Sequence, residues 1–303
     1  MSHVIQVRDL KKSYGQLVAV DGVSFSVQQG EIFSIVGPNG AGKTTIIETL
    51  IGLRGADGGQ ISVLGLDPQR DARALGNRIG TQLQQAALPD RMKVWEALDL
   101  YASFYERTIP WEPLLEQWGL GDKRSARFAD LSGGQKQRLF ICLALLNDPE
   151  IVFLDELTTG LDPQARRATW ELVTAIRDHG KTVIVISHYM DEVEALADRV
   201  AIIDHGQLIA LDTPANLINE LHGETRVHFT SSNGFEPNQL SGVAGVTSVA
   251  QENNHITVSG HGPLLARVAA ALAEHNVAPA DLRVDHASLE DVFLALTGKT
   301  IRD

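Results

Sequence analysis

The chain has 303 residues, of which 44% are hydrophobic and 21% charged, and its formal net charge at pH 7 is -12. This length and composition predict a globular protein with one large core and a smaller appended unit, and they exclude a disordered chain. Because the phosphate backbone of nucleic acids attracts clustered Lys and Arg, nucleic acid is not expected as the main partner of so acidic a chain.

The first part of the chain reads as short strands that lead into a glycine-rich turn. The β-rich segments lie at 4–7, 17–20, 24–27 and 32–36. After the turn, residues 44–53 have helical character, and residues 61–63 predict a further strand. The segment from 32 to 53 is therefore predicted to be a strand, a loop and a helix in direct succession.

The middle of the chain changes to helical periodicity and then to alternating strands and helices. Between 89 and 118, apolar residues recur at three- and four-residue steps, which predicts a helical insertion. Apolar, β-branched runs at 151–154 and 183–186 predict buried strands, separated by a helix that starts at Pro163 and runs past Ile176. This alternation predicts a parallel sheet covered on both faces.

The last third contains a change of composition. A hairpin is predicted at 200–211, turning on His205 and Gly206, and a helix capped by Thr213 follows it. From about Glu224 the chain becomes rich in Ser, Asn and Gly with short alternating segments, which predicts a small α/β appendage. We therefore predict two domains, residues 1–221 and residues 222–303.

Two helices are predicted within this appendage, at 263–275 and after Ser288. Ser288 and Asp291 have the spacing of a capping box, and Gly298 is a natural stop for the last helix.

Membrane spans, secretion signals and cysteine usage narrow the class of protein further. The longest apolar run, residues 139–146, is much shorter than the roughly 20 residues that a helix needs to cross a bilayer. The first residues lack the basic start and continuous apolar stretch of a secretory signal, so a cytoplasmic location is expected. The single cysteine, Cys142, is expected in the core, and the ten scattered His predict no zinc site.

Residues 37–44 read GPNGAGKT, which matches the phosphate-binding pattern of two spaced glycines followed by Lys and a hydroxyl residue. Glycines let backbone N–H groups turn toward phosphates, Lys43 adds a positive charge, and Thr44 can hold Mg²⁺ at the start of a helix. A chance glycine turn is the alternative, and the flanking strand and helix disfavour it. The residues expected to bind the phosphates are Gly37, Pro38, Asn39, Gly40, Ala41, Gly42, Lys43, Thr44 and Thr45.

Residues 151–156 read IVFLDE, a buried strand that ends in two carboxylates. Burying two neighbouring charges is costly unless a cation is bound. Asp155 is therefore expected to assist Mg²⁺, and Glu156 to orient or deprotonate the attacking water. The alternative, a pair of helix-capping residues after a strand, is weakened by the phosphate loop upstream. Together the two motifs predict an ATPase or a GTPase.

Residues 131–135 read LSGGQ and run directly into a helical stretch. Ser132, Gly133, Gly134 and Gln135 are thus predicted to lie at the positive end of a helix, which favours an anion. This is a second anion site in a chain that already has one.

This order of motifs resembles the nucleotide-binding subunits of ABC transporters, whose signature sequence is LSGGQ, and the likeness covers residues 1–221. It implies an α/β P-loop cassette with a mixed central sheet, an antiparallel β subdomain and a helical subdomain, followed here by a small C-terminal α/β domain. It also implies a head-to-tail dimer, in which the LSGGQ of one copy caps the ATP held by the phosphate loop of the other. The implied cofactors are ATP and Mg²⁺.

The resemblance extends to single residues outside these motifs. Tyr14 resembles the aromatic residue that stacks on adenine, and Asp162 in GLDPQ resembles the residue that links the two ATP sites across the dimer. His188, after the predicted strand VIVIS, resembles the histidine that contacts the γ-phosphate, although a lone His at a strand end is usually a surface residue.

Gln84 resembles the glutamine that contacts Mg²⁺ and the membrane partner, and its neighbours Gln82 and Gln85 leave this assignment open. The implied catalytic set is Glu156, His188, Gln84 and Lys43, and the implied metal ligands are Thr44, Gln84 and Asp155.

One position departs from the family pattern, because Leu157 stands where Pro usually follows the catalytic Glu. Proline would bias Glu156 toward an extended backbone, so its absence predicts looser placement and slower turnover. The alternative, which we favour, is that surrounding packing fixes Glu156.

The tail SLEDVFLALTG resembles the ATPase subunits of drug exporters of the daunorubicin-resistance type, and composition alone indicates only an amphipathic helix. The expected function is ATP hydrolysis that powers export of a drug-like or other small molecule through a separate membrane permease. The protein would then sit peripherally on the inner face of the cell membrane. The alternatives are an importer subunit, a soluble ABC ATPase without a transport role, and a regulatory module that holds ATP without using it.

Overall fold

The computed structural model describes residues 2–82, 87–220, 225–230, 235–275, 277, 279–285 and 287–298. The chain divides into two compact units, one up to Pro214 and one from Ala215 to Gly298. The predicted domain boundary at 221/222 falls on residues outside the described ranges.

The first unit opens with a three-stranded antiparallel sheet in the order β2 (Leu17–Gln28), β1 (His3–Tyr14) and β4 (Gly58–Val63). The short segments predicted at 4–7, 17–20 and 24–27 are parts of the two long strands β1 and β2. A β-bulge explains why β1 seemed to end early. The register shifts between Val7 and Leu10, where Asp9 has a φ of 49°, so the alternation of buried and exposed side chains is broken there.

The central sheet has six strands in the order β5 (Ile79–Gln82), β6 (Ile151–Asp155), β7 (Thr182–Ile186), β3 (Ile32–Val36), β8 (Arg199–Asp204) and β9 (Gln207–Asp212). All neighbours are parallel except β8 and β9, which form an antiparallel hairpin. The hairpin turns on His205 and Gly206, both with positive φ, as predicted.

The parallel strands β6, β7 and β3 send alternate side chains into two different cores. In β6, Ile151 and Phe153 join the core shared with the antiparallel sheet and α1 (Lys43–Leu50). Val152 and Leu154 join the core shared with the helices on the other side. The predicted parallel sheet covered on both faces is therefore confirmed.

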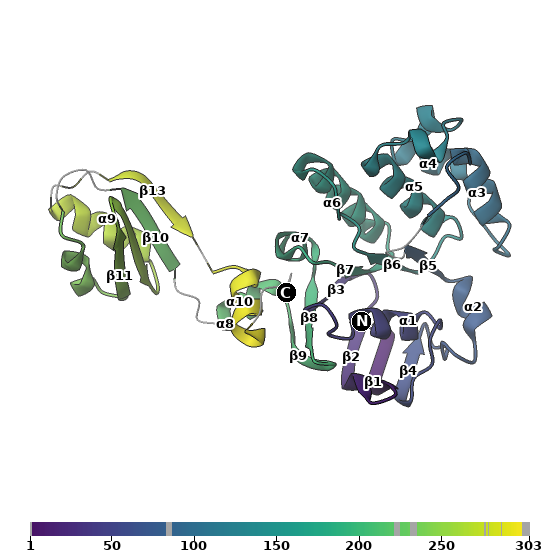
Figure 1. The fold of residues 1–303 in the computed structure, drawn as a ribbon, viewed down its shortest axis with the longest axis horizontal. Coiled ribbons are helices and arrows are strands. Elements are labelled where there is room, and N and C mark those ends of the chain that lie inside the picture. Colours follow the sequence, from purple (N-terminus) through teal and green to yellow (C-terminus); the bar gives the residue numbers. More distant parts are fainter. Residues whose placement is uncertain are drawn as a thin grey trace. The chain divides into compact units, whose positions relative to one another are not determined.

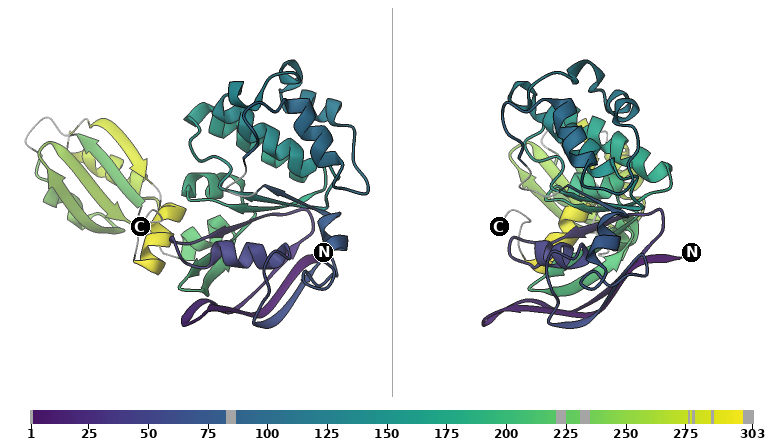
Figure 2. Two further views of the ribbon diagram at one scale, coloured as in Figure 1. Left: turned by 45° about the vertical axis from the view of Figure 1, so that its right-hand side comes forward. Right: turned by 90° about the vertical axis from the view of Figure 1, so that its right-hand side faces the viewer.

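The helical layer consists of α3 (Val94–Ala102), α4 (Trp111–Gln117), α5 (Gly133–Leu145) and α6 (Pro163–Asp178). Figures 1 and 2 show these helices on one face of the central sheet and α1 with the antiparallel sheet on the other. Cys142 of α5 is buried in the helical core, as expected. Shorter elements complete the unit: α2 (Ala72–Gly76), α7 (Met190–Leu196) and the 3-10 turns Gly121–Lys123 and Phe128–Asp130.

The second unit contains a four-stranded antiparallel sheet in the order β11 (Val246–Glu252), β12 (His255–Gly260), β10 (Thr225–Thr230) and β13 (Ala280–Asp285). Helix α9 (Leu264–Glu274) packs its buried face, which includes Val268, against Val227 and Val258 of the sheet. The other elements are α8 (Pro214–Glu220), a 3-10 turn (Pro237–Gly242) and α10 (Leu289–Thr297).

Helix α10 begins and ends as predicted. Ser288 and Asp291 form a reciprocal capping box, and Gly298 closes the helix in the left-handed conformation with a φ of 66°.

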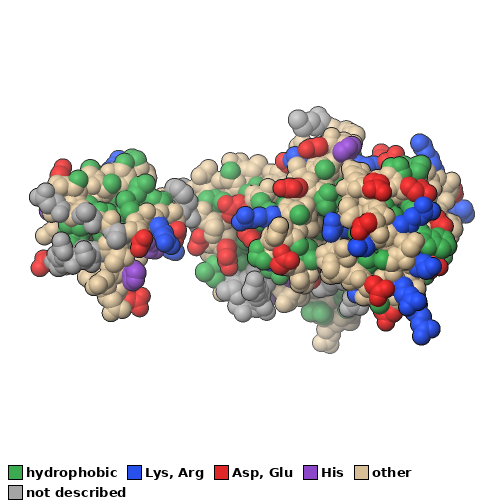
Figure 3. Space-filling model, turned by 90° about the horizontal axis from the view of Figure 1, so that it is seen from above, with side chains coloured by type: hydrophobic (Ala, Val, Ile, Leu, Met, Phe, Trp, Pro, Cys, Tyr) green, Lys and Arg blue, Asp and Glu red, His purple; other side chains and the backbone are tan. Residues whose placement is uncertain are grey.

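No helix within the described ranges is long and apolar enough to span a membrane. On the face of the chain seen in Figure 3, acidic and basic side chains are intermixed.

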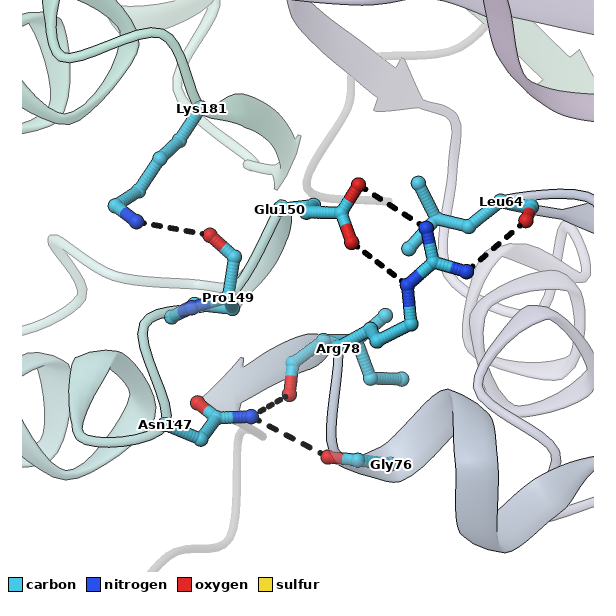
Figure 4. A network of polar contacts seen from close by, with 8 residues as sticks. Leu64, Gly76, Arg78, Asn147, Pro149, Glu150 and Lys181 are labelled. Atoms are coloured by element: carbon cyan, nitrogen blue, oxygen red, sulfur yellow. Dashed lines mark hydrogen bonds and ion pairs between the residues drawn. The ribbon is translucent and has the colours of Figure 1, made fainter. Parts of the chain in front are cut away.

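A polar network joins the residues that precede neighbouring strands at the amino-terminal edge of the central sheet (Figure 4). Arg78, just before β5, makes two hydrogen bonds with Glu150, just before β6, at 2.6 and 3.1 Å. The Asn147 amide donates to the backbone carbonyl of Ile79 at 2.8 Å. Lys181, just before β7, donates to the carbonyl of Pro149. The polar side chains at this edge therefore form their hydrogen bonds with other groups of the protein.

Candidate functional site

The glycine-rich loop connects β3 to α1 at the carboxyl-terminal edge of the central sheet. Lys43 begins α1 and is only 7% exposed. Its ammonium group donates to the carbonyl oxygens of Gly37 at 2.7 Å and Pro38 at 2.8 Å, so the loop curls around it. Burial lowers the pKa of Lys43, and the carboxylates of Glu156 and Asp155 oppose that change. The lysine is therefore held where its charge faces two acidic groups.

Two glycines of the loop are required by close backbone packing. A Cβ atom on Gly37 would lie 2.1 Å from the carbonyl oxygen of Ile203 in β8. A Cβ atom on Gly42, whose φ is 102°, would lie 2.3 Å from the carbonyl oxygen of Ala19 in β2. The loop thus rests directly on two strands.

The loop ends at a helix N-terminus, which is suited to anions. The first intrahelical bond runs from the N–H of Ile46 to the carbonyl of Gly42. The N–H groups of the preceding residues, up to Thr45, lie in the turn where helices leave donors for other partners. The Thr44 side chain is exposed in this turn. The predicted placement of the phosphate loop between strand and helix is thus confirmed.

The two carboxylates of IVFLDE lie where β6 ends. Asp155 is 7% exposed. Burial first, and then the charge of Glu156, raise the pKa of Asp155 to about 6, against the opposing effect of Lys43. A buried acid held partly toward its neutral form is a feature of sites that take a cation or move a proton.

Glu156 and His188 are brought together by the strand order. The two residues are far apart in sequence, but β6 and β7 are neighbours, and a hydrogen bond joins His188 Nε2 to Glu156 Oε1. The N–H of Glu156 donates to the carbonyl of Ile186 at 2.9 Å, and Glu156 has a φ of 51°. A non-glycine residue in this conformation is uncommon, and such residues concentrate at functional sites. His188 is therefore partly buried beside Glu156 and is not an isolated surface residue.

Packing holds the segment after Glu156 without a proline. Leu157 is 1% exposed and lies in the helical core. Together with the backbone bond of Glu156 to Ile186, this contact supports the favoured alternative for the departure at this position.

Ser132 of the predicted anion site and Asp162, which resembles the residue that links the two ATP sites, are both helix caps. Ser132 accepts from the N–H of Gln135, whose side chain accepts from the N–H of Ser132, so a capping box starts α5. Asp162 accepts from the N–H groups of Gln164 and Ala165 at the start of α6. Gly133 and Gly134 form the first turn of α5. LSGGQ therefore lies at a positive helix end, as predicted.

The remaining predicted residues are less firmly tied to this centre. Tyr14 ends β1 with 39% of its surface exposed, and the cations of Lys12 and Arg54 lie 5.7 and 5.3 Å from its ring centroid. Gln84 lies outside the described residues. Its neighbour Gln82 is buried at the end of β5, beside β6.

The sequence patterns did not indicate a further buried acid near this site, Glu192. Glu192 of α7 is buried and accepts hydrogen bonds from the side chains of Thr158, Ser187 and Trp170. The available signal was its position, since it shares the buried face of α7 with Val193 and Leu196. An acidic residue on a buried face is unusual unless it has partners.

Comparison with known proteins identifies the family of the chain. Residues 20–159 match the model of the ABC transporter family. The linearmycin resistance ATP-binding protein of Bacillus subtilis (strain 168) is 35% identical over 312 residues, which cover 99% of this chain and 100% of that protein. The Nod factor export ATP-binding protein I of Burkholderia lata is 37% identical over 310 residues, covering 99% and 98%.

Solved structures agree with this result. An ATP-binding cassette of an ABC transporter in its ADP conformation is 27% identical, with a TM-score of 0.64, and the match covers 70% of this chain and 92% of that chain. The predicted cassette fold is therefore confirmed. With both relatives matched over almost their whole length, the chain belongs to the family of ATP-binding subunits of ABC transporters, which are ATPases.

Proposed function

We propose that this chain powers an exporter, and that it hydrolyses ATP to move a drug-like or other small molecule through a separate integral membrane permease. The observation that carries the chemistry is the Glu156–His188 pair beside the loop that holds Lys43. The direction of transport is supported by the relatives named for Nod factor export and linearmycin resistance, which match the tail as well as the cassette. An importer remains the second candidate only by family membership.

ATP binding begins with an exchange of partners at Lys43. In the protein alone its ammonium group is bonded to two carbonyl oxygens of the loop. We propose that the β- and γ-phosphates replace these carbonyls, because a charge-assisted bond to phosphate is stronger than a bond to a neutral carbonyl. The phosphates are also held by the backbone N–H groups of 37–45, and Tyr14 stacks on the adenine.

Hydrolysis uses the two residues at the ends of β6 and β7. Glu156 accepts a proton from water as the water oxygen attacks the γ-phosphorus, and the bond to the bridging oxygen of ADP breaks. His188, now bonded to Glu156, contacts the γ-phosphate once ATP is present. This pair orients the attacking water, and that orientation accounts for most of the pair's contribution to the rate enhancement. The reason is that phosphoryl transfer depends mainly on positioning and charge.

The residues present suit Mg²⁺. The cation prefers oxygen ligands, and it usually keeps waters and phosphate oxygens in its coordination shell and takes only one or two from the protein. The buried Asp155 carboxylate, whose pKa is raised by burial, and the exposed Thr44 hydroxyl provide such ligands. We propose that these two residues hold Mg²⁺, with Gln84 as the third. When bound, the ion neutralises charge on the phosphates.

We propose a head-to-tail dimer as the working form. Ser132, Gly133, Gly134 and Gln135 form a second positive helix end in a chain with one phosphate loop. A second copy supplies the missing ligand, because its bound ATP presents the γ-phosphate to this helix end. Asp162 lies at the start of α6 and links the two sites across the dimer.

We further propose that the ATP-binding domain comprises residues 1–221 and the accessory domain residues 222–303. In this arrangement the protein is cytoplasmic and attaches to the inner face of the membrane through its permease, with the region around Gln84 and the helical insertion at 89–118 as the contact.

The test uses the chain together with its permease in vesicles. Glu156→Gln should lower the rate of phosphate release by about 10²- to 10⁴-fold, the usual range for a general base. It should leave ATP binding intact and, by light scattering, trap an ATP-dependent dimer. Wild-type hydrolysis rates in this variant, or scattering that shows only monomers with ATP and permease present, would contradict the proposal.

A further inference from the structure

Among the described residues, two buried carboxylates, Glu31 and Glu192, take no part in the proposed chemistry, and Glu192 is the more deeply buried of the two. Glu192 of α7 is 1% exposed. Its Oε2 accepts from the hydroxyl of Thr158 at 3.1 Å and from the hydroxyl of Ser187, and its Oε1 accepts from the indole N–H of Trp170 at 3.1 Å. Burial raises the pKa of Glu192, and these three hydrogen bonds oppose the rise.

Each of the two hydroxyl donors lies close in sequence to one member of the Glu156–His188 pair. Thr158 follows Glu156 by two residues in the segment after β6. Ser187 directly precedes His188, and its Oγ also accepts from the N–H of Tyr189 at 3.0 Å. The turn that carries His188 is therefore closed on the same hydroxyl that donates to Glu192. A single carboxylate thus ties together the backbone segments of both reacting side chains.

Helix α6 also contacts the carboxylate of Glu192. Trp170 donates to Glu192 as described, and the guanidinium group of Arg166 lies 3.9 Å from the ring centroid of Tyr189. Arg166 also contributes a favourable charge to Glu192. Because α6 begins at Asp162, the buried carboxylate connects the start of this helix with the two segments that carry Glu156 and His188.

A purely structural role explains this arrangement poorly. A buried charge with several donors is commonly no more stabilising than well-packed apolar residues of the same volume. A buried carboxylate differs from apolar residues in the direction of its contacts, because each hydrogen bond fixes the position of the group that donates it.

We propose that Glu192 is a positioning residue for hydrolysis, which holds Glu156 and His188 in their paired geometry through Thr158 and Ser187 without contacting the nucleotide. This inference rests on the proposed function of the Glu156–His188 pair. A small displacement of such a pair is costly, since misplacement by about 1 Å can lower a rate by about 100-fold.

The first experiment compares Glu192→Gln with Glu194→Gln, which makes the same change on the exposed face of α7. The amide keeps the volume of the side chain but offers one acceptor oxygen for three donors. We expect kcat for ATP hydrolysis to fall by about 10- to 100-fold in Glu192→Gln, with unchanged affinity for ATP. The Glu194→Gln control should match wild type. A normal kcat in Glu192→Gln, or a change in ATP affinity alone, would overturn the proposal.

A second pair of variants keeps the proposal testable if Glu192→Gln does not fold. Thr158→Val removes the hydroxyl at constant shape, and Thr158→Ser retains it. We expect kcat to fall in Thr158→Val and to be preserved in Thr158→Ser. Equal rates in the two variants would show that the hydroxyl does not matter and would overturn the inference.

A double-mutant cycle separates positioning from general loss of structure. Glu192→Gln should lower the rate by a clearly smaller factor in a His188→Ala background than in wild type, because residues that act as a unit are not additive. The part of the loss that remains belongs to Glu156, which Glu192 positions through Thr158. The full loss in both backgrounds would instead indicate an independent structural effect and contradict the proposal. Failure of the proposed function is distinguishable, because His188→Ala and Glu156→Gln would then hydrolyse ATP at the wild-type rate whatever Glu192 does.

Discussion

The charged residues at the two edges of the central sheet differ in burial and in how their charges are paired. At the amino-terminal edge, Arg78 and Glu150 form a two-bond ion pair with side chains 39% and 53% exposed (Figure 4). At the carboxyl-terminal edge, Asp155 and Glu156 are consecutive acids that share one buried cation, Lys43. At the amino-terminal edge each charge has a partner of opposite sign, whereas at the carboxyl-terminal edge two acids face one lysine and Glu156 has a positive φ of 51°. Shifted pKa values and uncommon backbone conformations concentrate at functional sites.

The largest expected effect is the loss of the cation at the carboxyl-terminal edge. Lys43→Met keeps the aliphatic stem but removes the charged hydrogen bonds that we propose Lys43 makes to the phosphates, which would be worth about 3 kcal/mol together. ATP affinity should therefore fall about 100-fold in titration calorimetry. Lys181→Met, which removes a lysine from the other edge, should leave ATP affinity unchanged. Equal losses in the two variants would mean that the two edges do not differ in function.

The next largest effect is on stability and its pH dependence. Asp155 has a pKa of about 6 in the folded chain against an ordinary value of 3.8. Between these values the folded state binds more protons than the unfolded state, so stability falls as pH rises through this window. In the absence of nucleotide and Mg²⁺, the difference corresponds to about 3 kcal/mol above pH 6.

Asp155→Asn should remove most of this pH dependence and stabilise the nucleotide-free protein at pH 7, as measured by urea unfolding between pH 4 and pH 8. Glu156 and Glu48 raise the pKa of Asp155 and Lys43 lowers it, so these three groups are kept unchanged in the experiment. Glu150→Gln at the other edge should preserve the slope. Burial also raises the pKa of Glu31 and Glu192, so a small slope of the same sign should remain. A slope in Asp155→Asn equal to that of wild type would assign the effect to these groups.

A smaller effect is expected from the buried amide of the amino-terminal edge. Asn147 is 5% exposed and donates to the carbonyls of Ile79 and Gly76. Asn147→Ala leaves buried acceptors without their donor and should lower the free energy of unfolding by about 2 kcal/mol. The rate of ATP hydrolysis per folded molecule should not change. A loss of kcat at full folding would show that this edge takes part in function.

The smallest effect is expected for the exposed ion pair. Arg78→Met removes both bonds to Glu150, but exposed pairs contribute only about 1 kcal/mol or less. Thermal unfolding should therefore shift slightly, and the shift should diminish in high salt. A loss of several kcal/mol would mean that this pair is not screened by solvent.

Sequence patterns identified the parts of the site that depend on near neighbours in the chain. The phosphate loop was visible because a strand, a glycine run and a helix follow one another directly. The capping box at Ser288 was visible for the same reason, since it involves residues three apart. The bulge at Asp9 shows the limit of this approach, because one break in alternation hid the true length of β1.

By itself, then, the sequence determined the succession of strand, glycine-rich loop and helix and the buried strands β6 and β7, because short-range spacing and apolar runs specify them. Only the tertiary structure decided that His188 meets Glu156, that Leu157 anchors the segment after it, and that Glu192 lies behind both. The physical reason is the strand order. It places β7 beside β6 and between β6 and β3, and long-range packing of two cores sets this order without any local pattern to reveal it.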